Sequence, residues 1–313
     1  MRWTGLRAEI PAPFLFSMVL LLLSPTHAWS CSMCRCGDPT FNALGTEIYS
    51  PGAFRLAVDW DRMEKSEGPL GESESQVTNT VTATMSYSFG DRLNLVARVP
   101  YAFKSLTGSM DGVVETTDTH GVADPEFFAW FRLWASPLEA GVGRRAWISV
   151  LAGVKTPWGR DDLTGPDGER LEEHAQPGTG STDAFAGLGG FYLIDVGSSL
   201  FGSAQYRWTG TNPHGYRYGR IFLANVGYER KLGSVIDAVL ELNYRWAGED
   251  TVDASGEKDP DTGGSLLYVT PRVLVNLGGD FVARASVLIP TFKSLNGYQT
   301  EKAIVSAGLT YTF

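Results

Sequence analysis

The sequence predicts an all-β protein, a transmembrane antiparallel up-and-down β-barrel of about twelve strands that follows a cleaved signal peptide. Three observations lead to this prediction. From residue 53 onward, apolar side chains recur at every second position in a series of short segments. The connections between these segments alternate between long and short. Aromatic residues gather near both ends of the segments, as they do at the two interfaces of a membrane barrel.

The composition is that of a folded chain. Of the 313 residues, 43% are hydrophobic and 12% are aromatic, which is too many for a disordered protein. The net charge of −9 argues against a dedicated nucleic-acid binder. No run of 18 apolar residues follows residue 30, so the mature chain is expected to lack a helical membrane anchor.

The N-terminal residues have the features of an export signal. Arg2 and Arg7 precede a ten-residue apolar core at 14–23, and Thr26-His27-Ala28 offers small residues at the cleavage positions. Such a core is too short to span a bilayer but suits a signal peptide. We therefore expect a signal peptide at 1–28, a cysteine-containing periplasmic segment at 29–52 and the barrel at 53–313.

Strands are predicted from a period of two, because successive side chains of a strand point to opposite faces. In segment 76–89, Val77, Val81 and Met85 alternate with Gln, Thr and Ser residues. A helix would need a period of 3.6, which these segments lack. The twelve predicted strands are 53–62, 76–89, 92–103, 121–135, 144–156, 181–193, 197–209, 218–230, 235–246, 265–277, 280–290 and 302–313.

The connections favour a membrane barrel over a soluble sandwich. The odd-numbered connections are long or polar, whereas the even-numbered ones are mostly tight, as at Gly90-Asp91 and Gly278-Gly279. Bacterial outer-membrane barrels have short periplasmic turns and long external loops, so both termini are expected in the periplasm. Every backbone polar group must be paired within lipid, and the first strand is therefore expected to pair with the last. The odd-numbered connections are 63–75, 104–120, 157–180, 210–217, 247–264 and 291–301.

The aromatic residues on the apolar faces are expected to form two belts. The chain also ends in Tyr311-Thr312-Phe313, and a last strand that finishes in Phe resembles the assembly signal of outer-membrane barrels. The external belt is predicted to contain Trp60, Tyr101, Phe103, Trp208, Tyr244 and Trp246, and the periplasmic belt Tyr87, Phe89, Tyr192, Tyr228, Tyr311 and Phe313.

Charges are distributed unevenly between the loops and the barrel interior. Four odd-numbered connections carry a combined charge of −14, against −9 for the whole chain. By strand parity the interior contains the candidate lumen residues, and Asp59, Asp237 and Glu241 share it. Two interpretations remain open: a basic lumen that favours anionic or hydrogen-bonding solutes, or a network of ion pairs that plugs a narrow barrel. The candidate lumen and selectivity residues are Arg55, Arg98, Arg132, Lys155, Asp183, Arg207, Arg245, Arg272 and Arg284.

Three short motifs resemble those of a known family. Gly121-Val122-Ala123-Asp124-Pro125-Glu126, Gly153-Val154-Lys155-Thr156-Pro157-Trp158-Gly159-Arg160 and Pro177-Gly178-Thr179-Gly180-Ser181-Thr182-Asp183 resemble elements of the outer-membrane transporters of the phenol-degradation meta-pathway type. Ala123 departs from the usual glycine. The resemblance covers roughly residues 53–313 and implies uptake of aromatic or other hydrophobic compounds. From the residues themselves, Lys155 and Asp183 are expected to pair inside the barrel.

Three cysteines stand close together near the N-terminus. Cys31, Cys34 and Cys36 are the only cysteines of the chain. They could form one disulfide with a spare thiol, bind a soft metal such as copper(I) or zinc, or contact a periplasmic redox partner. Cys31 could also be lipidated.

The leading functional hypothesis is an outer-membrane channel for passive passage of small solutes, either aromatic, hydrophobic or anionic. Its expected partners are outer-membrane lipid, a small-molecule solute and, through the cysteines, a periplasmic protein. The alternative is a non-conducting scaffold barrel that docks a redox or metal-carrying partner at Cys31, Cys34 and Cys36. An enzyme is not expected, because a barrel phospholipase needs a Ser/His pair on its outer wall. His120, His174 and His214 fall in predicted loops, and His27 falls in the signal.

Overall fold

The computed structural model describes residues 52–68, 73–110, 113–139, 143–252 and 255–313. The predicted signal peptide and the cysteines lie outside these residues. Within them the strands are β1 (Phe54–Glu67), β2 (Ser73–Phe89), β3 (Leu93–Met110), β4 (Val113–Val122), β5 (Glu126–Ala135), β6 (Leu138–Glu139), β7 (Gly143–Arg144), β8 (Ala146–Lys155), β9 (Asp183–Asp195), β10 (Ser198–Trp208), β11 (Ile221–Lys231), β12 (Ile236–Ala247), β13 (Gly264–Gly278), β14 (Phe281–Leu295), β15 (Thr300–Glu301) and β16 (Ile304–Thr312).

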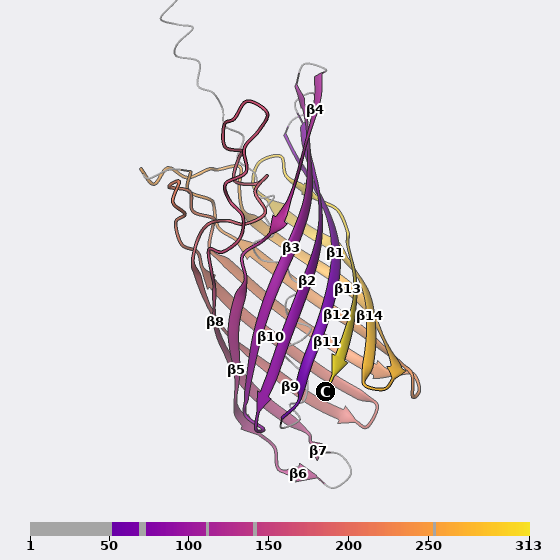
Figure 1. The fold of residues 1–313 in the computed structure, drawn as a ribbon. Helices are drawn as coiled ribbons and strands as arrows, with labels where there is room; N and C mark the ends of the chain where they lie inside the picture. Colours follow the sequence, from indigo (N-terminus) through magenta and orange to yellow (C-terminus); the bar gives the residue numbers. More distant parts are fainter. Residues whose placement is uncertain (1–51, 69–72, 111–112, 140–142, 253–254) are drawn as a thin grey trace, which may run out of the picture.

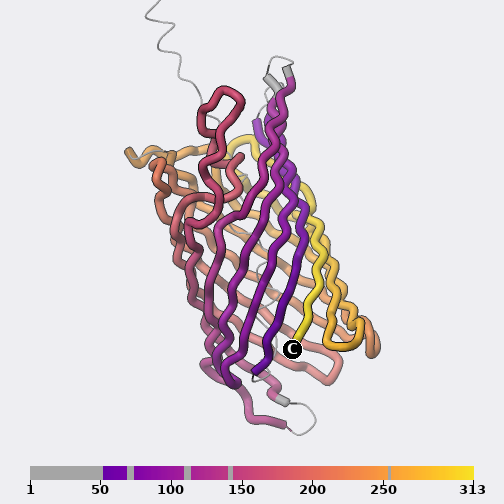
Figure 2. The backbone as a smooth tube through the Cα atoms, viewed as in Figure 1, coloured from indigo at the N-terminus to yellow at the C-terminus, as the bar shows by residue number. Residues whose placement is uncertain are grey.

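The strands form a closed antiparallel barrel with twelve strand positions (Figures 1 and 2). One of the twelve strand positions is occupied by both β4 and β5, which pair with successive parts of β3. The barrel closes between β1 and β16, with a register that runs from Arg55 opposite Thr312 to Arg62 opposite Val305. The amide of Phe313 also donates to the carbonyl of Phe54 at 2.7 Å. The predicted pairing of the first strand with the last is therefore confirmed.

Three of the predicted loops are partly strand. The ladder of β1 and β2 continues to Glu67 and Glu74, and that of β3 and β4 continues to Met110 and Val113. β14 likewise extends to Leu295 and is followed by β15. The predicted loops 63–75, 104–120 and 291–301 are therefore too long. The hydropathy pattern fades there because both faces become polar, whereas backbone pairing continues without it.

The two ends of the barrel differ in their connections. The short-turn end carries the tight connections and the C-terminus, and a small β6–β7 hairpin lies in its longest connection (Figure 1). The long-loop end carries the other connections, including 156–182 between β8 and β9, and there the β3–β4 hairpin rises above the wall (Figure 1). Among the described residues, no helix has the length and apolar character needed to cross a membrane.

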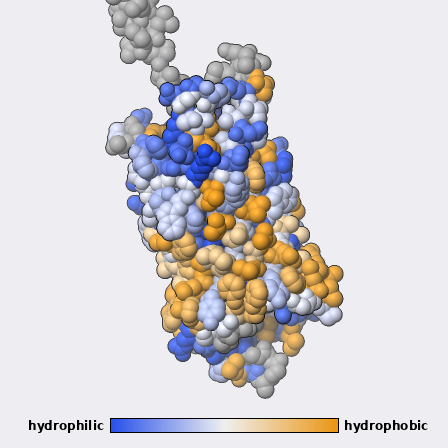
Figure 3. Space-filling model, viewed as in Figure 1, coloured by the Kyte–Doolittle hydropathy of each residue, from blue (hydrophilic) through white to orange (hydrophobic). Residues whose placement is uncertain are grey.

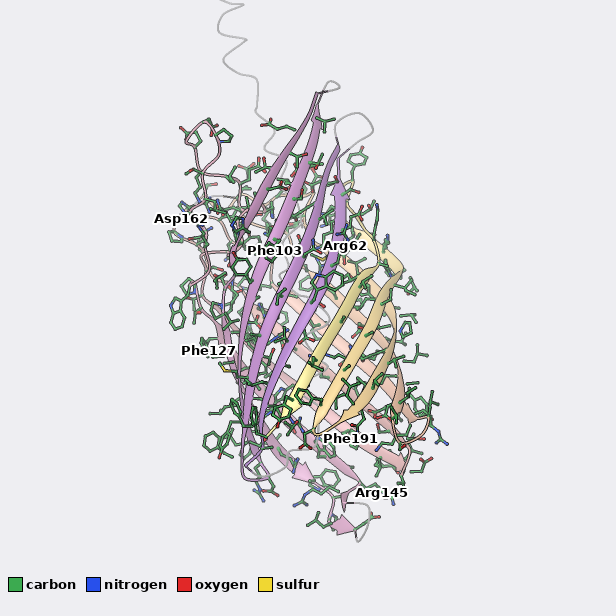
Figure 4. The ribbon with its side chains drawn as sticks, turned by 45° about the vertical axis from the view of Figure 1, so that its right-hand side comes forward. Arg62, Phe103, Phe127, Arg145, Asp162 and Phe191 are labelled. Carbon is green, nitrogen blue, oxygen red and sulfur yellow. The ribbon has the colours of Figure 1, made fainter. Side chains whose placement is uncertain are left out.

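The barrel wall is apolar outside and mostly polar inside. Outward side chains such as Val58, Leu188 and Leu240 are more than half exposed, whereas inward Thr80 and Asn243 are 1% exposed. Apolar surface gathers over the lower, short-turn half of the molecule (Figure 3). All twelve aromatic residues of the predicted belts lie at outward positions, of which Phe103 is labelled in Figure 4. An apolar outer face around a polar interior, the reverse of a water-soluble protein, is the arrangement of a transmembrane barrel.

Candidate solute pathway through the barrel

The charged side chains that the sequence assigns to the interior lie at inward positions of their strands. Arg132, Lys155, Arg207, Arg245 and Arg272 are each at most 8% exposed, and Asp183 is 1% exposed. The others, Arg55, Arg98 and Arg284, are half-buried. The structure therefore places these nine side chains on the inward face of the wall, and their role in selectivity stays a prediction.

Acidic partners neutralise most of these cations. Glu126 lies 3.7 Å from Arg98 and 2.5 Å from Arg207, and Glu241 lies 2.9 Å from Arg272. Glu126 was missed by sequence reasoning, although it directly follows the Asp124-Pro125 motif and shares the inward parity. The interior is therefore much less basic than the cations alone imply.

A second acid, Glu301, lies at the centre of a buried cluster. Its carboxylate is 3.3 Å from Lys65 and 3.2 Å from Arg245, and it accepts a hydrogen bond from the hydroxyl of Tyr268. The sequence placed Glu301 in a loop. Lys65 pairs with Glu301 on β15 whereas Arg62 pairs with Val305 on β16, so the two registers differ by one residue. A one-residue offset moves a side chain to the other face of a sheet.

A close approach across β16 accommodates a further ion pair. Arg284 on β14 donates from its Nε to Asp59 on β1 at 2.7 Å, although β16 lies between their strands. Gly308 is the residue of β16 between them. A Cβ on Gly308 would lie 2.1 Å from the Asp59 carboxylate, so a larger residue there would displace the pair.

The three family-like motifs converge on the buried ammonium group of Lys155. Its Nζ lies 3.0 Å from Asp124 and 3.1 Å from Asp183, which is the pairing with Asp183 that the sequence predicted. The other oxygen of Asp124 accepts from the amide of Gly159 at 2.9 Å. The Asp124 carboxylate also accepts from the amide of Thr179 at 2.8 Å. The motifs thus fix both ends of the connection 156–182 to the wall.

Glycine is required where these motif segments touch. A Cβ on Gly159 would lie 2.6 Å from the Asp124 carboxylate and 2.7 Å from the backbone of Ala123. Gly178 approaches the backbone of Gly159 equally closely. The glycines of the motifs therefore serve close packing of backbone at the loop base.

The middle of this connection folds into the long-loop end of the lumen. His174, Ala175 and Gln176 are each at most 3% exposed. Their carbonyls accept hydrogen bonds from the barrel wall: Gln76 and Lys104 bind the His174 carbonyl at 2.9 and 2.8 Å. Lys104 and Thr119 bind the next two carbonyls, of Gln176 and Ala175 respectively, each at 2.5 Å. Loop backbone thus narrows this end of the barrel.

Two other long connections hold the inserted loop from the opposite side. The hydroxyl of Tyr216 donates to Asp250 at 2.5 Å and lies 3.3 Å from Nε2 of His174. Tyr218 donates to the carbonyl of Glu173 at 3.1 Å. Asp250 belongs to the acidic connection 247–264, but it is 5% exposed and is part of this buried network.

Four titratable groups, Glu67, Glu74, Glu172 and His174, lie close together at the long-loop end, beyond the part of the wall that spans the membrane. Glu74 lies on β2 five residues beyond Asn79, which pairs with the belt residue Phe103, and this is roughly 16 Å at the rise of a strand. Burial, together with the carboxylates of Glu172 and Glu67, raises the pKa of Glu74 to about 7, against a smaller lowering by His174. Glu74 therefore changes its charge near neutral pH.

Apolar patches also line the lumen, which the sequence analysis did not predict. Val96, Phe128, Trp130, Leu151 and Phe185 form one buried cluster inside β3, β5, β8 and β9. Segment 126–135 has apolar residues at both parities, and this was the signal for an apolar interior. A second cluster contains Met63, Leu266, Tyr268, Leu288 and Ile304.

At the short-turn end the lumen holds an open cavity of about 570 Å³. Phe191, Leu193 and Phe201 contribute an apolar side, and Phe191 is labelled near this end in Figure 4. Val196, Val239, Leu274 and Val282 add apolar surface elsewhere in the lining, and the remaining side chains are charged or polar. They are Arg55, Ser198, Ser199, Glu229, Lys231, Asp237, Arg272, Asn276, Arg284, Thr310 and Thr312.

The histidines are not all where the sequence placed them. His120 lies on β4 with an exposed, outward side chain stacked against Phe103 at 6.4 Å, so the prediction that no histidine occupies an outward strand position is wrong. The polar β3–β4 ladder that extends beyond the predicted strand carries it there. Within the described ranges, no group of three or more His, Cys, Asp or Glu residues could hold a metal ion.

Comparisons with known proteins identify the fold. The crystal structure of the COG4313 outer membrane channel from Pseudomonas putida F1 matches with a TM-score of 0.64 and 12% identity, over 85% of this chain and 97% of that one. The translocator domain of autotransporter NalP from Neisseria meningitidis matches with a TM-score of 0.49 and 13% identity, over 86% and 91% of the two chains. No family model and no curated protein matches the sequence. The first likeness shows that the chain has the fold of an outer-membrane β-barrel.

Proposed function

We propose that this protein is an outer-membrane channel that passes small solutes passively, with its short-turn end facing the periplasm. The observation that supports this most directly is the 570 Å³ cavity inside a closed wall whose outer face is apolar. A barrel that served only as a scaffold would have no need of such a space. The structural likeness to a protein described as an outer membrane channel adds support for the class.

The solutes we propose are small and at least partly apolar. Aromatic and aliphatic side chains line parts of the interior, while ion pairs remove most of the net charge of the cationic side chains there. The motifs that resemble transporters of the phenol-degradation meta-pathway type also favour aromatic compounds. Of the candidate selectivity residues, Arg55, Arg272 and Arg284 line the cavity and are the ones we expect to contact a solute.

Conductance measurements test the proposal. The full mature chain, refolded and inserted in planar bilayers, is expected to give discrete current steps in potassium chloride, and liposomes that carry it are expected to swell in small neutral solutes. The matched control is the same preparation heat-denatured before insertion. Absence of both steps and swelling would contradict a channel, and copurification of a periplasmic protein through Cys31, Cys34 and Cys36 would then favour the scaffold.

A further inference from the structure

The loop that enters the long-loop end of the lumen is anchored next to several carboxylates. Gln76 on β2 and Lys104 on β3 both donate to the carbonyl of His174. Glu74 precedes Gln76 by two residues on the same strand and therefore shares its inward face. Glu172 precedes the anchored carbonyl by two residues in the loop. The anchor of the loop and the acids thus belong to one small region of the lumen.

Two acids of the wall are direct partners in a strand ladder. Glu74 on β2 lies opposite Glu67 on β1, and Glu67 is 7% exposed. Residues opposite each other have Cβ atoms about 4.5–5.5 Å apart, and two negative charges at that separation are destabilising. Burial and the carboxylates of Glu172 and Glu67 raise the pKa of Glu74 to about 7, against a lowering by His174. Ionisation of Glu74 therefore adds repulsion toward both the wall and the loop.

The other charged groups of this region are engaged with different partners or lie further away. Lys65 on β1 is 3.3 Å from Glu301, and Lys104 on β3 donates to the loop carbonyls. In the loop itself, Arg170 and Glu173 pair with each other at 2.7 Å. On β4, Glu115 is exposed and lies two strands away from Glu74. The carboxylate of the loop that acts on Glu74 is that of Glu172.

We propose that the inserted loop is a pH-sensitive gate, which stays in the lumen while Glu74 is protonated and is released as Glu74 ionises. The inserted loop brings Glu172 beside Glu74, so Glu74 loses its proton less readily in the closed arrangement than in the open one. The balance between the two arrangements must then depend on pH, by the same linkage that couples folding to proton binding. A rise in pH is expected to open the long-loop end. The proposal rests on the proposed function, because the gate regulates passage through the channel.

Backbone hydrogen exchange of segment 170–178, measured by mass spectrometry on the full mature chain in detergent, tests the gate without relying on conductance. Relative to the intrinsic rate at each pH, exchange is expected to accelerate at least about fivefold between about pH 5.5 and about pH 8.5. Glu74→Gln cannot ionise and is expected to keep the slow rate at both values. Glu172→Gln removes the repulsion on the loop side and is expected to show a smaller acceleration. His174→Gln is expected to keep the acceleration, because the proposal assigns the proton to Glu74.

Glu169→Gln is the matched control, because Glu169 is an exposed carboxylate of the same loop and is not among the groups that shift the pKa of Glu74. Equal relative exchange at both pH values in the natural protein would overturn the gate. Undiminished acceleration in Glu74→Gln, loss of it in His174→Gln, or equal effects of Glu169→Gln and Glu172→Gln would also overturn it.

Conductance recorded at the same two pH values separates the gate from the channel. Open times are expected to lengthen at the higher pH. Current steps with open times that do not change with pH would overturn only the gate, whereas pH-dependent exchange without any current would overturn the channel but not the release of the loop.

Discussion

The two ends of the lumen are built from the same strands but differ in what fills them. At the long-loop end, inward Gln76 and Lys104 bind the backbone of an inserted loop. At the short-turn end, inward Arg55 and Thr312 line an open cavity. The wall has the same alternation at both levels, so the difference arises from the connections. A connection of more than twenty residues can fold back into the barrel, whereas a tight turn has no residues to spare for it.

The largest effect on this comparison is expected from Lys155→Met. It would leave the carboxylates of Asp124 and Asp183 buried without their cation, and breaking a buried ion pair from one side costs about 3–5 kcal/mol. The unfolding free energy in detergent micelles, measured by urea titration, should fall by about that amount. Adding Asp124→Asn and Asp183→Asn should restore part of it.

Lys302→Met is the matched control, because its pair with Glu64 lies on the surface with the lysine side chain 65% exposed. Exposed pairs contribute about 0–1 kcal/mol. If the two lysine variants lost equal stability, the convergence of the three motifs on Lys155 would not be what secures the loop base.

A smaller effect is expected from releasing the middle of the loop. Lys104→Met removes the donor to the carbonyls of His174 and Gln176. Hydrogen bonds from a charged group contribute about 1.5–3 kcal/mol, so the ratio of open to closed states should rise roughly tenfold or more. Single-channel recording would show this as longer open times.

Arg62→Met is the control for that recording, since Arg62 is exposed on the outside of β1, as Figure 4 shows. Unchanged open times in Lys104→Met, or an equal change in Arg62→Met, would mean that the inserted loop does not limit the current. The narrow part of the pathway would then have to lie elsewhere in the lumen.

The wall was predictable from the sequence, whereas the contents of the lumen were not. The alternation of apolar and polar residues located the twelve strands of the barrel and inward charges such as Arg98 and Arg207, because successive side chains of a strand point to opposite faces. It could not locate Glu301, since a one-residue offset between β15 and β16 reverses the side on which that residue lies. Nor could it place His174. The inserted loop is held by hydrogen bonds to its backbone carbonyls, and every residue type has such a carbonyl, so the sequence gives no signal for them.

The smallest expected effect concerns the pH dependence of the long-loop end. The pKa of Glu74 is about 7 in the folded protein, against 4.5 for a free glutamate, because burial and the carboxylates of Glu172 and Glu67 outweigh the opposite effect of His174. The folded state therefore holds this proton more tightly than the unfolded state, and its contribution to stability is present below pH 4.5 and is lost as the pH rises to 7. Urea titrations across this window should give a falling unfolding free energy in the natural protein and a flatter profile in Glu74→Gln. Glu115→Gln, at an exposed position of β4, should keep the natural slope, and equal slopes in all three proteins would show that Glu74 does not couple the packing of this end to pH.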